Sequence, residues 1–442
     1  MFKKILIANR GEIALRILRA CRELDIKTVA IHSEADESAM HVKMSDESVC
    51  VGPAAAQLSY LNIPAIITAA TITNVDAIHP GYGFLSENKR FAEIIEEHGI
   101  KFIGPKSSHI ELMGDKIRAK EIMQKNGVPT VPGLNDLNNV SDIKNFIQDE
   151  GLPVIIKAAS GGGGKGMRIL NDINNLEKSI ESAKIEAKKS FNDDKVYIEK
   201  YLQNPKHIEI QILSDSEGNI VTLGERDCSI QRKHQKLIEE CPSNSLTDID
   251  RKKISEICVK AIKSIGYEGV GTLEFLYENN KFYFMEMNTR LQVEHPVTEM
   301  VTQIDLVKQQ ILAAFGKKIL FSQNDVHMKG HSIECRINAE HPKTFIPSPG
   351  KISQYHQPGG LGVRVDSAMY QGCSVPPHYD SLIAKLITFG DTREDCIKKM
   401  KRALEEYVII GIDTNIQLHQ KIIQSQDFIS GNYDINYMSR FD

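Results

Sequence analysis

The sequence predicts a multidomain chain that combines α/β and α+β units. Its 442 residues exceed the ~100–200 residues of one ordinary domain, so two or three packed units are expected. The 41% of apolar residues can fill cores of that size. The chain opens with a strand over residues 4–8, a helix with apolar spacing over 12–24, and a strand over 28–31. Such alternation predicts a parallel sheet that is covered by helices.

Further units follow along the chain. The prolines within residues 129–132 favour a hinge in front of a small α+β unit over about residues 130–200. Strands and helices alternate again from residue 201 to about residue 317. A strand-like run over 332–338 then opens a third unit.

Composition argues against several classes of protein. Lys and Arg total 54 against 58 Asp and Glu, and a formal charge of −4 favours neither a nucleic-acid partner nor a membrane surface. There is no secretory signal and no run approaching the ~20 apolar residues of a membrane span. The eight cysteines include no C-x-x-C pair, so we expect neither a zinc site nor disulfides, and a cytoplasmic location. The first turn, residues 9–12, lacks G-x-G-x-x-G, which disfavours a dinucleotide-dependent oxidoreductase.

A glycine-rich loop joins two predicted strands. Residues 160–166 read S-G-G-G-G-K-G and lie between a strand over 153–157 and another over 167–170. A Walker loop needs G-x-x-x-x-G-K-[ST] and a following helix, and both features are missing. The backbone N–H groups of such a hairpin can still cover phosphates or form a lid. Lys157 beside it then favours a phosphate contact, and the alternative is a flexible exposed hairpin.

Three oxygen-bearing side chains fall on one predicted hairpin. Strands over 271–276 and 282–288 flank a turn, and Glu286 and Asn288 share a face of the second strand. The hairpin can bring Glu274 near them. Two carboxylates and an amide oxygen suit Mg²⁺ that shares its shell with nucleotide phosphates. The alternative is the polar face of a half-buried hairpin.

The segment after this hairpin alternates charged and polar side chains. If it is extended, Arg290, Gln292 and Glu294 point the same way. A guanidinium, an amide and a carboxylate could hold a small oxyanion and remove its proton. A solvated polar edge is the alternative here, as it is for the charged run 225–236, and His207 and His234 taken singly are more often structural than catalytic.

Taken together, these segments resemble the biotin carboxylase family within the ATP-grasp superfamily. The resemblance runs from residue 5 to about residue 415. The matching segments are residues 7–14, 79–88, 114–116, 160–167, 225–236, 286–299 and 334–340. It implies a Rossmann-like N-terminal αβ domain over 1–112, an ATP-grasp domain over 113–330 whose mobile lid spans about 130–200, and a C-terminal biotin carboxylase domain over 331–442.

The resemblance also implies roles for individual residues. Those implied to bind ATP are Lys116, Lys157, Gly163, Gly164, Glu199, Lys200, Tyr201, Leu202, His207, Gln231, His234 and Leu276. Those implied to bind Mg²⁺ or Mn²⁺ are Glu274, Glu286 and Asn288. Bicarbonate is expected on Lys236, Arg290, Gln292 and Val293, with Glu294 as its base, and Arg336 is expected to face the ureido oxygen of biotin. Lys236, Arg290, Glu294 and Arg336 form the expected catalytic set.

The implied activity is ATP-dependent carboxylation of biotin by bicarbonate through carboxyphosphate. The sequence contains no Ala-Met-Lys-Met attachment motif, so biotin is expected on a separate carrier protein. We therefore expect the biotin carboxylase component of acetyl-CoA carboxylase, which starts fatty acid synthesis, with a biotin carboxyl carrier protein and carboxyltransferase subunits as partners and a homodimer as its assembly. The alternatives are the corresponding subunit of another carboxylase, a different ATP-grasp ligase, or a non-catalytic ATP-binding protein.

Overall fold

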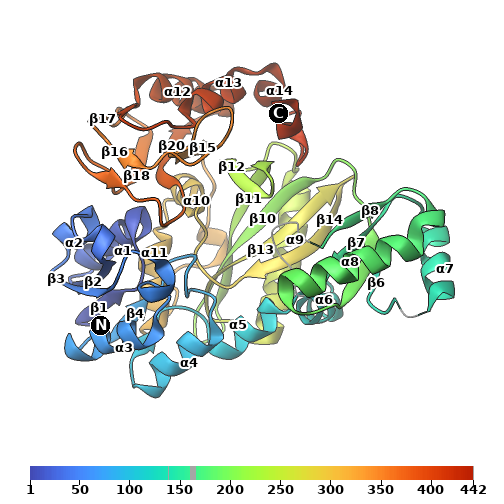
Figure 1. Ribbon diagram of the computed structural model, residues 1–442, viewed down its shortest axis with the longest axis horizontal. Helices are drawn as coiled ribbons and strands as arrows, with labels where there is room; N and C mark the ends of the chain where they lie inside the picture. The colour runs from blue at the N-terminus through green and yellow to red at the C-terminus, as the bar shows by residue number, and fades with distance from the viewer. Residues whose placement is uncertain (138, 160–165, 442) are drawn as a thin grey trace.

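The computed structural model describes residues 1–137, 139–159 and 166–441. Figure 1 shows an α/β unit at the N-terminus, a long sheet through the centre, a small unit that projects to one side, and a C-terminal unit. Gly163 and Gly164 lie outside the described residues.

The N-terminal unit is built on a parallel sheet, as the strand–helix–strand pattern predicts. Its five strands lie in the order β3-β2-β1-β4-β5. Their bounds are β1 Lys4–Ile7, β2 Lys27–Ser33, β3 Glu47–Gly52, β4 Ala77–His79 and β5 Lys101–Phe102. The helices around it are α1 Gly11–Glu23, α2 Met40–Met44, α3 Ile63–Ile72 and α4 Lys89–Glu97. Ile13, Ile17 and Cys21 recur at helical spacing and are buried on one face of α1.

The projecting unit has its own sheet and its own core. Its strands β6 Gly133–Leu134, β7 Val154–Ala158, β8 Arg168–Leu170 and β9 Val196–Lys200 lie in the order β6-β9-β7-β8, with α7 Val140–Glu150 and α8 Leu176–Phe191 beside them. A buried cluster that includes Ile143, Ile156 and Ile198 draws all its members from residues 137–198. At its base, the Phe284 amide donates to the Pro129 carbonyl at 2.7 Å. We call residues 133–200 the lid.

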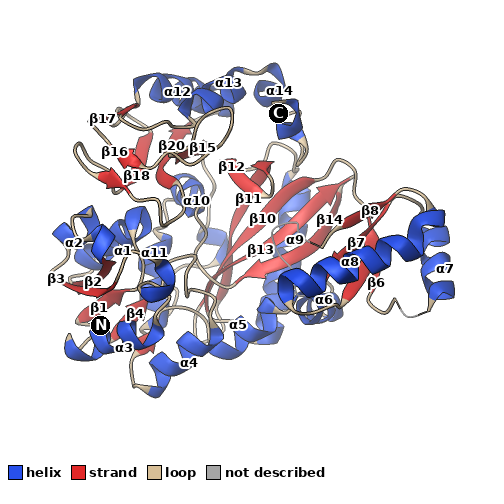
Figure 2. Cartoon of the chain, viewed as in Figure 1, coloured by secondary structure: helices blue, strands red, loops and turns tan. Residues whose placement is uncertain are grey.

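One antiparallel sheet joins the central part of the chain to the C-terminal part. Its eight strands lie in the order β14-β13-β10-β11-β12-β15-β20-β18. Their bounds are β10 Lys206–Ser214, β11 Ile220–Arg232, β12 Gln235–Cys241, β13 Gly269–Glu278, β14 Lys281–Asn288, β15 His331–Asn338, β18 Val363–Ser367 and β20 Leu382–Gly390. The expected strand at 332–338 is present as β15, and it pairs directly with β12. Figure 2 shows this sheet as the scaffold between the flanking helices.

Helices pack against the strands of this sheet along its length. Those of the central part are α5 Ser107–Gly114, α6 Lys116–Lys125, α9 Asp248–Ile265, α10 His295–Thr302 and α11 Leu306–Ala314. The C-terminal part adds α12 Arg393–Glu406, α13 Ile416–Gln424 and α14 Gln426–Ser430, with short strands β16 Gly350–Lys351, β17 Gln354–His356, β19 Ser374–Val375 and β21 Val408–Ile410. Buried clusters cross between units: Ile17 packs with Leu306, and Ile238 packs with Ile333.

Two further findings bear on the environment of the protein. Across the described residues, no helix combines the length and the apolar character needed to cross a membrane. All eight cysteines lie within the described residues and are free thiols, and seven of them are buried.

Candidate active site

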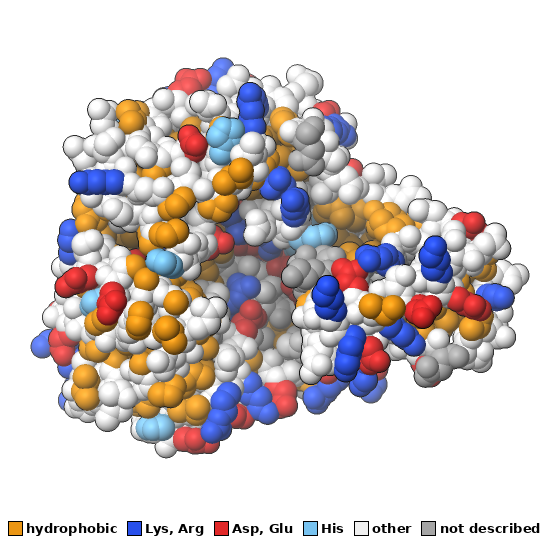
Figure 3. Space-filling model, viewed as in Figure 1, with side chains coloured by type: hydrophobic (Ala, Val, Ile, Leu, Met, Phe, Trp, Pro, Cys, Tyr) orange, Lys and Arg blue, Asp and Glu red, His pale blue; other side chains and the backbone are white. Residues whose placement is uncertain are grey.

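A cavity of about 760 Å³ opens where the N-terminal unit, the lid, the central sheet and the C-terminal part meet. Figure 3 shows the surface hollowed there, with charged side chains and histidine at its walls. Cavities of this size accommodate small ligands. The expected site residues that line it are Lys116, Lys157, Glu199, Lys200, Tyr201, Leu202, His207, Gln231, His234, Lys236, Glu274, Leu276, Glu286, Asn288, Arg290, Gln292, Val293 and Arg336. Glu294 is fully buried just behind this wall, in contact with Lys236 and Arg336.

The β13–β14 hairpin brings the expected metal ligands together. Asn279 and Asn280 form its turn with positive φ values of 51° and 60°, which suits the tight turn of a hairpin. Glu274 and Glu286 are cross-strand partners, and the Asn288 amide donates to Glu274 Oε1 at 2.8 Å. The site therefore offers two carboxylates and an amide oxygen at one wall of the cavity. This donor set fits a hard cation such as Mg²⁺.

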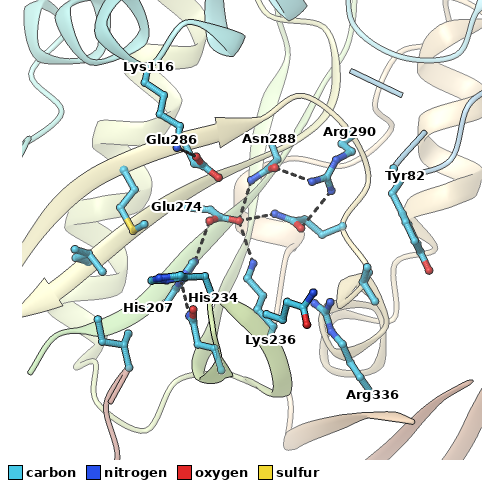
Figure 4. A pocket seen from close by; sticks show the side chains of 18 of the residues that line it. Tyr82, Lys116, His207, His234, Lys236, Glu274, Glu286, Asn288, Arg290 and Arg336 are labelled. Atoms are coloured by element: carbon cyan, nitrogen blue, oxygen red, sulfur yellow. Dashed lines mark hydrogen bonds and ion pairs between the residues drawn. The ribbon is translucent and has the colours of Figure 1, made fainter. Parts of the chain in front are cut away.

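Basic side chains of the protein contact these carboxylates. Glu286 Oε2 lies 3.0 Å from Lys116 Nζ, and Glu274 Oε2 lies 3.0 Å from His207 Nε2 (Figure 4). Burial alone would raise the pKa of Glu274, but Lys236 and His207 outweigh it and hold this pKa well below its ordinary value. Glu274 is therefore ionised and able to bind a cation.

Lys236 lies at the centre of a buried group of carboxylates. Its Nζ is 2.6 Å from Glu209 Oε2, 3.0 Å from Glu274 Oε1 and 2.6 Å from Glu294 Oε1. Burial would lower the pKa of Lys236, but the three carboxylates raise it well above its ordinary value. Glu209 also pairs with the fully buried Arg226. This end of the cavity is thus rich in fixed charge before any ligand binds.

Glu294 is held between two cations. Its Oε1 faces Lys236, and its Oε2 accepts from Arg336 Nη2 at 2.9 Å. Burial would raise the pKa of Glu294, but Lys236 and Arg336 lower it well below its ordinary value. Arg336 also donates through Nε to Glu239 Oε1 at 2.5 Å. Glu294 is therefore an ionised carboxylate that a small substrate can reach only beside Lys236 and Arg336.

The interpretation of residues 290–294 as an extended segment is wrong. In the described structure this stretch forms a loop, and Glu294 is the N-cap of α10 with φ −81° and ψ 10°. Pro296 in the first turn explains this, because proline favours the start of a helix. The side chains converge nevertheless: Gln292 donates to Glu274 at 2.8 Å, and Arg290 donates to Asn288 at 2.8 Å.

The end of the cavity that is expected to bind the nucleotide carries a cluster of lysines. Lys157 Nζ lies 2.8 Å from Glu199 Oε2, and Lys120 pairs with the other oxygen of the same carboxylate. Burial and the nearby charge of Lys116 lower the pKa of Lys157 to about 8. A cluster of partly desolvated ammonium groups favours a polyanion such as the phosphates of a nucleotide. The side chain of Glu199 is therefore engaged by lysines.

The other expected nucleotide residues surround an apolar space. Leu202, Leu276 and Met167 line it together with Ile435 from the C-terminal part. Lys200 reaches Glu150 at 3.4 Å, whereas Gln231 Nε2 lies 3.0 Å from His207 Nδ1 and orients that ring. His234 lies in the β11–β12 turn with φ +65°. A flat base fits between such apolar walls.

Sequence reasoning assigned no role to three further residues that the structure places at the site. Glu87 Oε2 accepts from Arg290 Nε at 2.8 Å and fixes that guanidinium. Lys120 lies one helical turn after Lys116 on α6, and that spacing is the signal that could have found it. Ile435 gives no local signal, because it reaches the cavity through a long-range contact in which its amide donates to the Pro205 carbonyl at 3.1 Å.

Fold and site together define an ATP-dependent ligase of the ATP-grasp class. Three family models match the chain: the biotin carboxylase N-terminal domain over residues 1–110, the ATP-binding domain of the carbamoyl-phosphate synthase L chain over 115–321, and the biotin carboxylase C-terminal domain over 334–440. The chain belongs to the biotin carboxylase family. This confirms the resemblance and the fold class that the motifs predict.

Individual relatives agree over their full length. The biotin carboxylase of Haemophilus influenzae is 58% identical over 442 residues, covering 100% of this chain and 99% of that protein. A biotin carboxylase from Campylobacter jejuni, solved as a β,γ-ATP complex, is 52% identical with a TM-score of 0.95 over 100% of this chain and 99% of that one. The biotin carboxylase domain dimer of the Hydrogenobacter thermophilus 2-oxoglutarate carboxylase, solved with MgADP, ADP and bicarbonate, is 50% identical with a TM-score of 0.93 at the same coverage.

Proposed function

We propose that this chain uses ATP and bicarbonate to carboxylate biotin on a separate carrier protein, as the biotin carboxylase component of an acetyl-CoA carboxylase. The observation that carries the proposal is the fully buried Glu294 between Lys236 and Arg336, in a cavity where Lys236 also contacts Glu274 of the metal hairpin. An ionised carboxylate beside two cations that can bind an oxyanion supports the role of a base acting on bicarbonate. Membership of the biotin carboxylase family supports the same reaction.

In the first half-reaction, Lys236 and Arg290 bind bicarbonate, and Gln292 and Val293 complete its pocket. As bicarbonate draws Lys236 toward itself, Glu294 loses part of its counter-charge, so its pKa rises and it accepts the proton. The bicarbonate oxygen then attacks the γ-phosphate, ADP leaves, and carboxyphosphate forms. Mg²⁺ or Mn²⁺, when held by Glu274, Glu286 and Asn288, neutralises charge on the phosphates.

In the second half-reaction, carboxyphosphate breaks down to carbon dioxide and phosphate, the phosphate takes the ureido proton of biotin, and the ureido nitrogen attacks the carbon dioxide to form carboxybiotin. Negative charge then develops on the ureido oxygen. Arg336 and Arg290 lie at this end of the cavity and stabilise that charge. The preorganised pairing of Arg336 with Glu239 and Glu294 supports this role, since little reorganisation is needed when the oxygen becomes negative.

We also propose the nucleotide-binding residues, the domain limits, the location and the assembly of this enzyme. The proposed nucleotide-binding residues are Lys116, Lys157, Gly163, Gly164, Glu199 to Leu202, His207, Gln231, His234 and Leu276. The proposed domains are 1–112, 113–330 with the lid at about 130–200, and 331–442, and the spans of the family models support these limits. We place the enzyme in the cytoplasm, as free thiols support. Its proposed assembly is a homodimer that works with a biotin carboxyl carrier protein and carboxyltransferase subunits.

A second candidate acceptor is supported by several of the comparisons. The related Hydrogenobacter protein is part of a 2-oxoglutarate carboxylase, so the same half-reaction can supply a complex that acts on an oxo acid rather than acetyl-CoA. The two candidates share every step at this site and differ only in the transferase that the carboxylated carrier meets.

The test is ATP cleavage measured with and without bicarbonate and free biotin. We expect ADP release to require bicarbonate and carboxybiotin to form slowly on free biotin. ATP cleavage that ignores bicarbonate and responds to an amino acid or a ribonucleotide would assign the chain to another ATP-grasp activity.

A further inference from the structure

A fully buried lysine outside the expected site touches the loop that carries the base. Lys385 on β20 has 0% exposure. Its Nζ donates to the Val293 carbonyl at 2.9 Å and lies 3.2 Å from Glu12 Oε1. An ammonium group is strongly disfavoured in a protein interior unless partners compensate it. These partners therefore account for its place there.

Lys385 and Arg336 act on consecutive residues of one loop. The two are cross-strand partners between β15 and β20, so their side chains emerge on the same face of the sheet. Arg336 holds the side chain of Glu294, and Lys385 holds the main-chain carbonyl of the preceding residue, Val293. The loop over 289–294 belongs to no strand of the described structure, so side-chain contacts of this kind fix its path.

On its other side, Lys385 contacts the N-terminal unit. Glu12 lies in the first turn of α1, and the oxygen that faces Lys385 also accepts a hydrogen bond from the Tyr82 hydroxyl. Tyr82 lines the cavity, on the side where Figure 4 shows Arg336 and away from Lys116 and Glu286. One ammonium group thus connects the base loop with the aromatic side chain across the cavity from the nucleotide end.

Two other acidic side chains lie near Lys385. Burial raises the pKa of Glu334 well above its ordinary value despite the opposing charge of Lys385, whereas Asp366 has its own partner. Asp366 Oδ2 is 3.9 Å from Lys385 Nζ but only 2.7 Å from Arg364 Nη2, and Arg364 Nε donates to Asp366 Oδ1 at 2.8 Å. Glu12, by contrast, is buried with Oε2 unpaired, and burial raises its pKa against the opposing charge of Lys385. The short contacts of Lys385 are therefore those to the Glu12 carboxylate and to the Val293 carbonyl.

We propose that Lys385 is a positioning residue that sets Glu294 and Tyr82 relative to each other, so that the bicarbonate and biotin ends of the cavity are built by one buried ammonium group. This inference rests on the proposed function, and it adds a residue that touches neither substrate. Lys385→Met should lower kcat/KM for both bicarbonate and biotin by about tenfold to a hundredfold, the loss expected when reacting groups are displaced by about 1 Å. KM for ATP should stay within about twofold, because the lysine cluster at Lys116, Lys120 and Lys157 does not depend on this contact.

Controls separate positioning from folding. Lys399→Met removes a lysine that also donates to a main-chain carbonyl, that of Phe389 at 3.0 Å, and pairs with Asp395 away from the cavity. It should leave all three kinetic constants unchanged. The double variant Lys385→Met with Glu12→Gln removes one positive and one negative charge together. It should unfold nearer the wild-type temperature than Lys385→Met, and its kcat/KM for bicarbonate should remain low.

The single variant Glu12→Gln is a second, independent test of the proposal. This variant keeps the hydrogen bond from Lys385 to the Val293 carbonyl but weakens the connection between Lys385 and Tyr82 through the Glu12 carboxylate. KM for biotin should therefore rise several-fold, while KM for bicarbonate stays near the wild-type value. Equal changes in the constants for ATP, bicarbonate and biotin in either single variant would overturn the proposal, as would wild-type constants in the double variant. Wild-type protein whose ATP cleavage ignores bicarbonate would instead contradict the proposed function and is a separate outcome.

Discussion

The lid and the central sheet hold their functional side chains in different ways. On the central sheet, Lys236 binds three carboxylates, and Arg336 ties Glu294 on the base loop to Glu239 on β12. These ion pairs join β10, β12, β13, β15 and the loop before α10. The lid contributes Lys157 and Glu199 from a unit whose buried core is its own.

This difference separates the reaction into a fixed part and a part that ligand binding completes. The charged groups that we propose to act on bicarbonate and biotin are paired within the central sheet without any ligand, which is the arrangement that favours electrostatic stabilisation of a transition state. The lid shares no buried core cluster with the rest of the described structure, so we propose that it moves as a body about residues 129–132 and closes over the nucleotide. The predictions below test the two parts in order of expected effect.

The largest effect is expected at the metal hairpin, where the two parts meet. Glu274→Gln with Glu286→Gln removes the two carboxylates that would hold the cation against the phosphates, so turnover should fall below detection at any accessible Mg²⁺ concentration. ADP release measured across a magnesium titration checks this. The exposed Glu394→Gln is the matched control, and near wild-type turnover in the double variant would show that the hairpin is structural.

Removing the base should affect both half-reactions. Glu294→Gln is expected to lower bicarbonate-dependent ATP cleavage and biotin carboxylation alike by about a thousandfold, within the usual range for general acid–base catalysis. Glu225→Gln, another buried carboxylate that pairs with Arg251 at 2.7 Å away from the cavity, controls for burial. A Glu294→Gln enzyme that retains either activity would remove Glu294 from its proposed role.

Arg336 distinguishes the two half-reactions. One charge-assisted hydrogen bond to a developing oxyanion contributes about 3 kcal/mol, so Arg336→Gln should slow carboxyl transfer by about a hundredfold and ATP cleavage by less. ADP release and carboxybiotin formation are measured on the same preparation, with Arg393→Gln as a control that breaks the buried pair with Glu240 instead. Equal losses in the two assays would assign Arg336 to bicarbonate or to folding.

The smallest effect is expected in the lid itself. ATP should slow amide hydrogen exchange of β7 and β8 several-fold, because the proposed closure of the lid over the nucleotide would reduce local opening of these strands. The strand β1 is the internal control, since its core is shared with the central part of the chain. Exchange in the lid that is already slow without nucleotide, and that ATP leaves unchanged, would contradict a moving lid.

The sequence is informative where structure is local. The strand–helix–strand opening and the β13–β14 hairpin depend on apolar spacing and turn residues within a few positions, and both are present. The hairpin prediction also allowed Glu274 to come near Glu286 and Asn288, and the structure makes the two glutamates cross-strand partners.

Contacts between segments far apart in the chain could not be predicted from the sequence. Glu87 meets Arg290 across about 200 residues, and Lys385 meets Val293 across 92, so no spacing rule connects them. Arg336 and Glu334 lie two residues apart on β15, a spacing that would suggest an ion pair between them. The partners of Arg336 are instead Glu239 and Glu294. Glu334 is buried, and burial raises the pKa of the Glu334 carboxyl well above its ordinary value.

The pairing of β12 with β15 limits how this chain can be divided. A cut near residue 330 falls in a connection between units, yet it would leave one fragment with the bare edge of β12 and the other with the bare edge of β15. Open strand edges of this length invite pairing between molecules, so the separated fragments should aggregate rather than fold. Within the described residues, the strands of the lid pair only with one another, so removing the lid would open no strand of the central sheet. Recombination between relatives should therefore tolerate exchange of residues 133–200, whereas residues 201–442 must be inherited together.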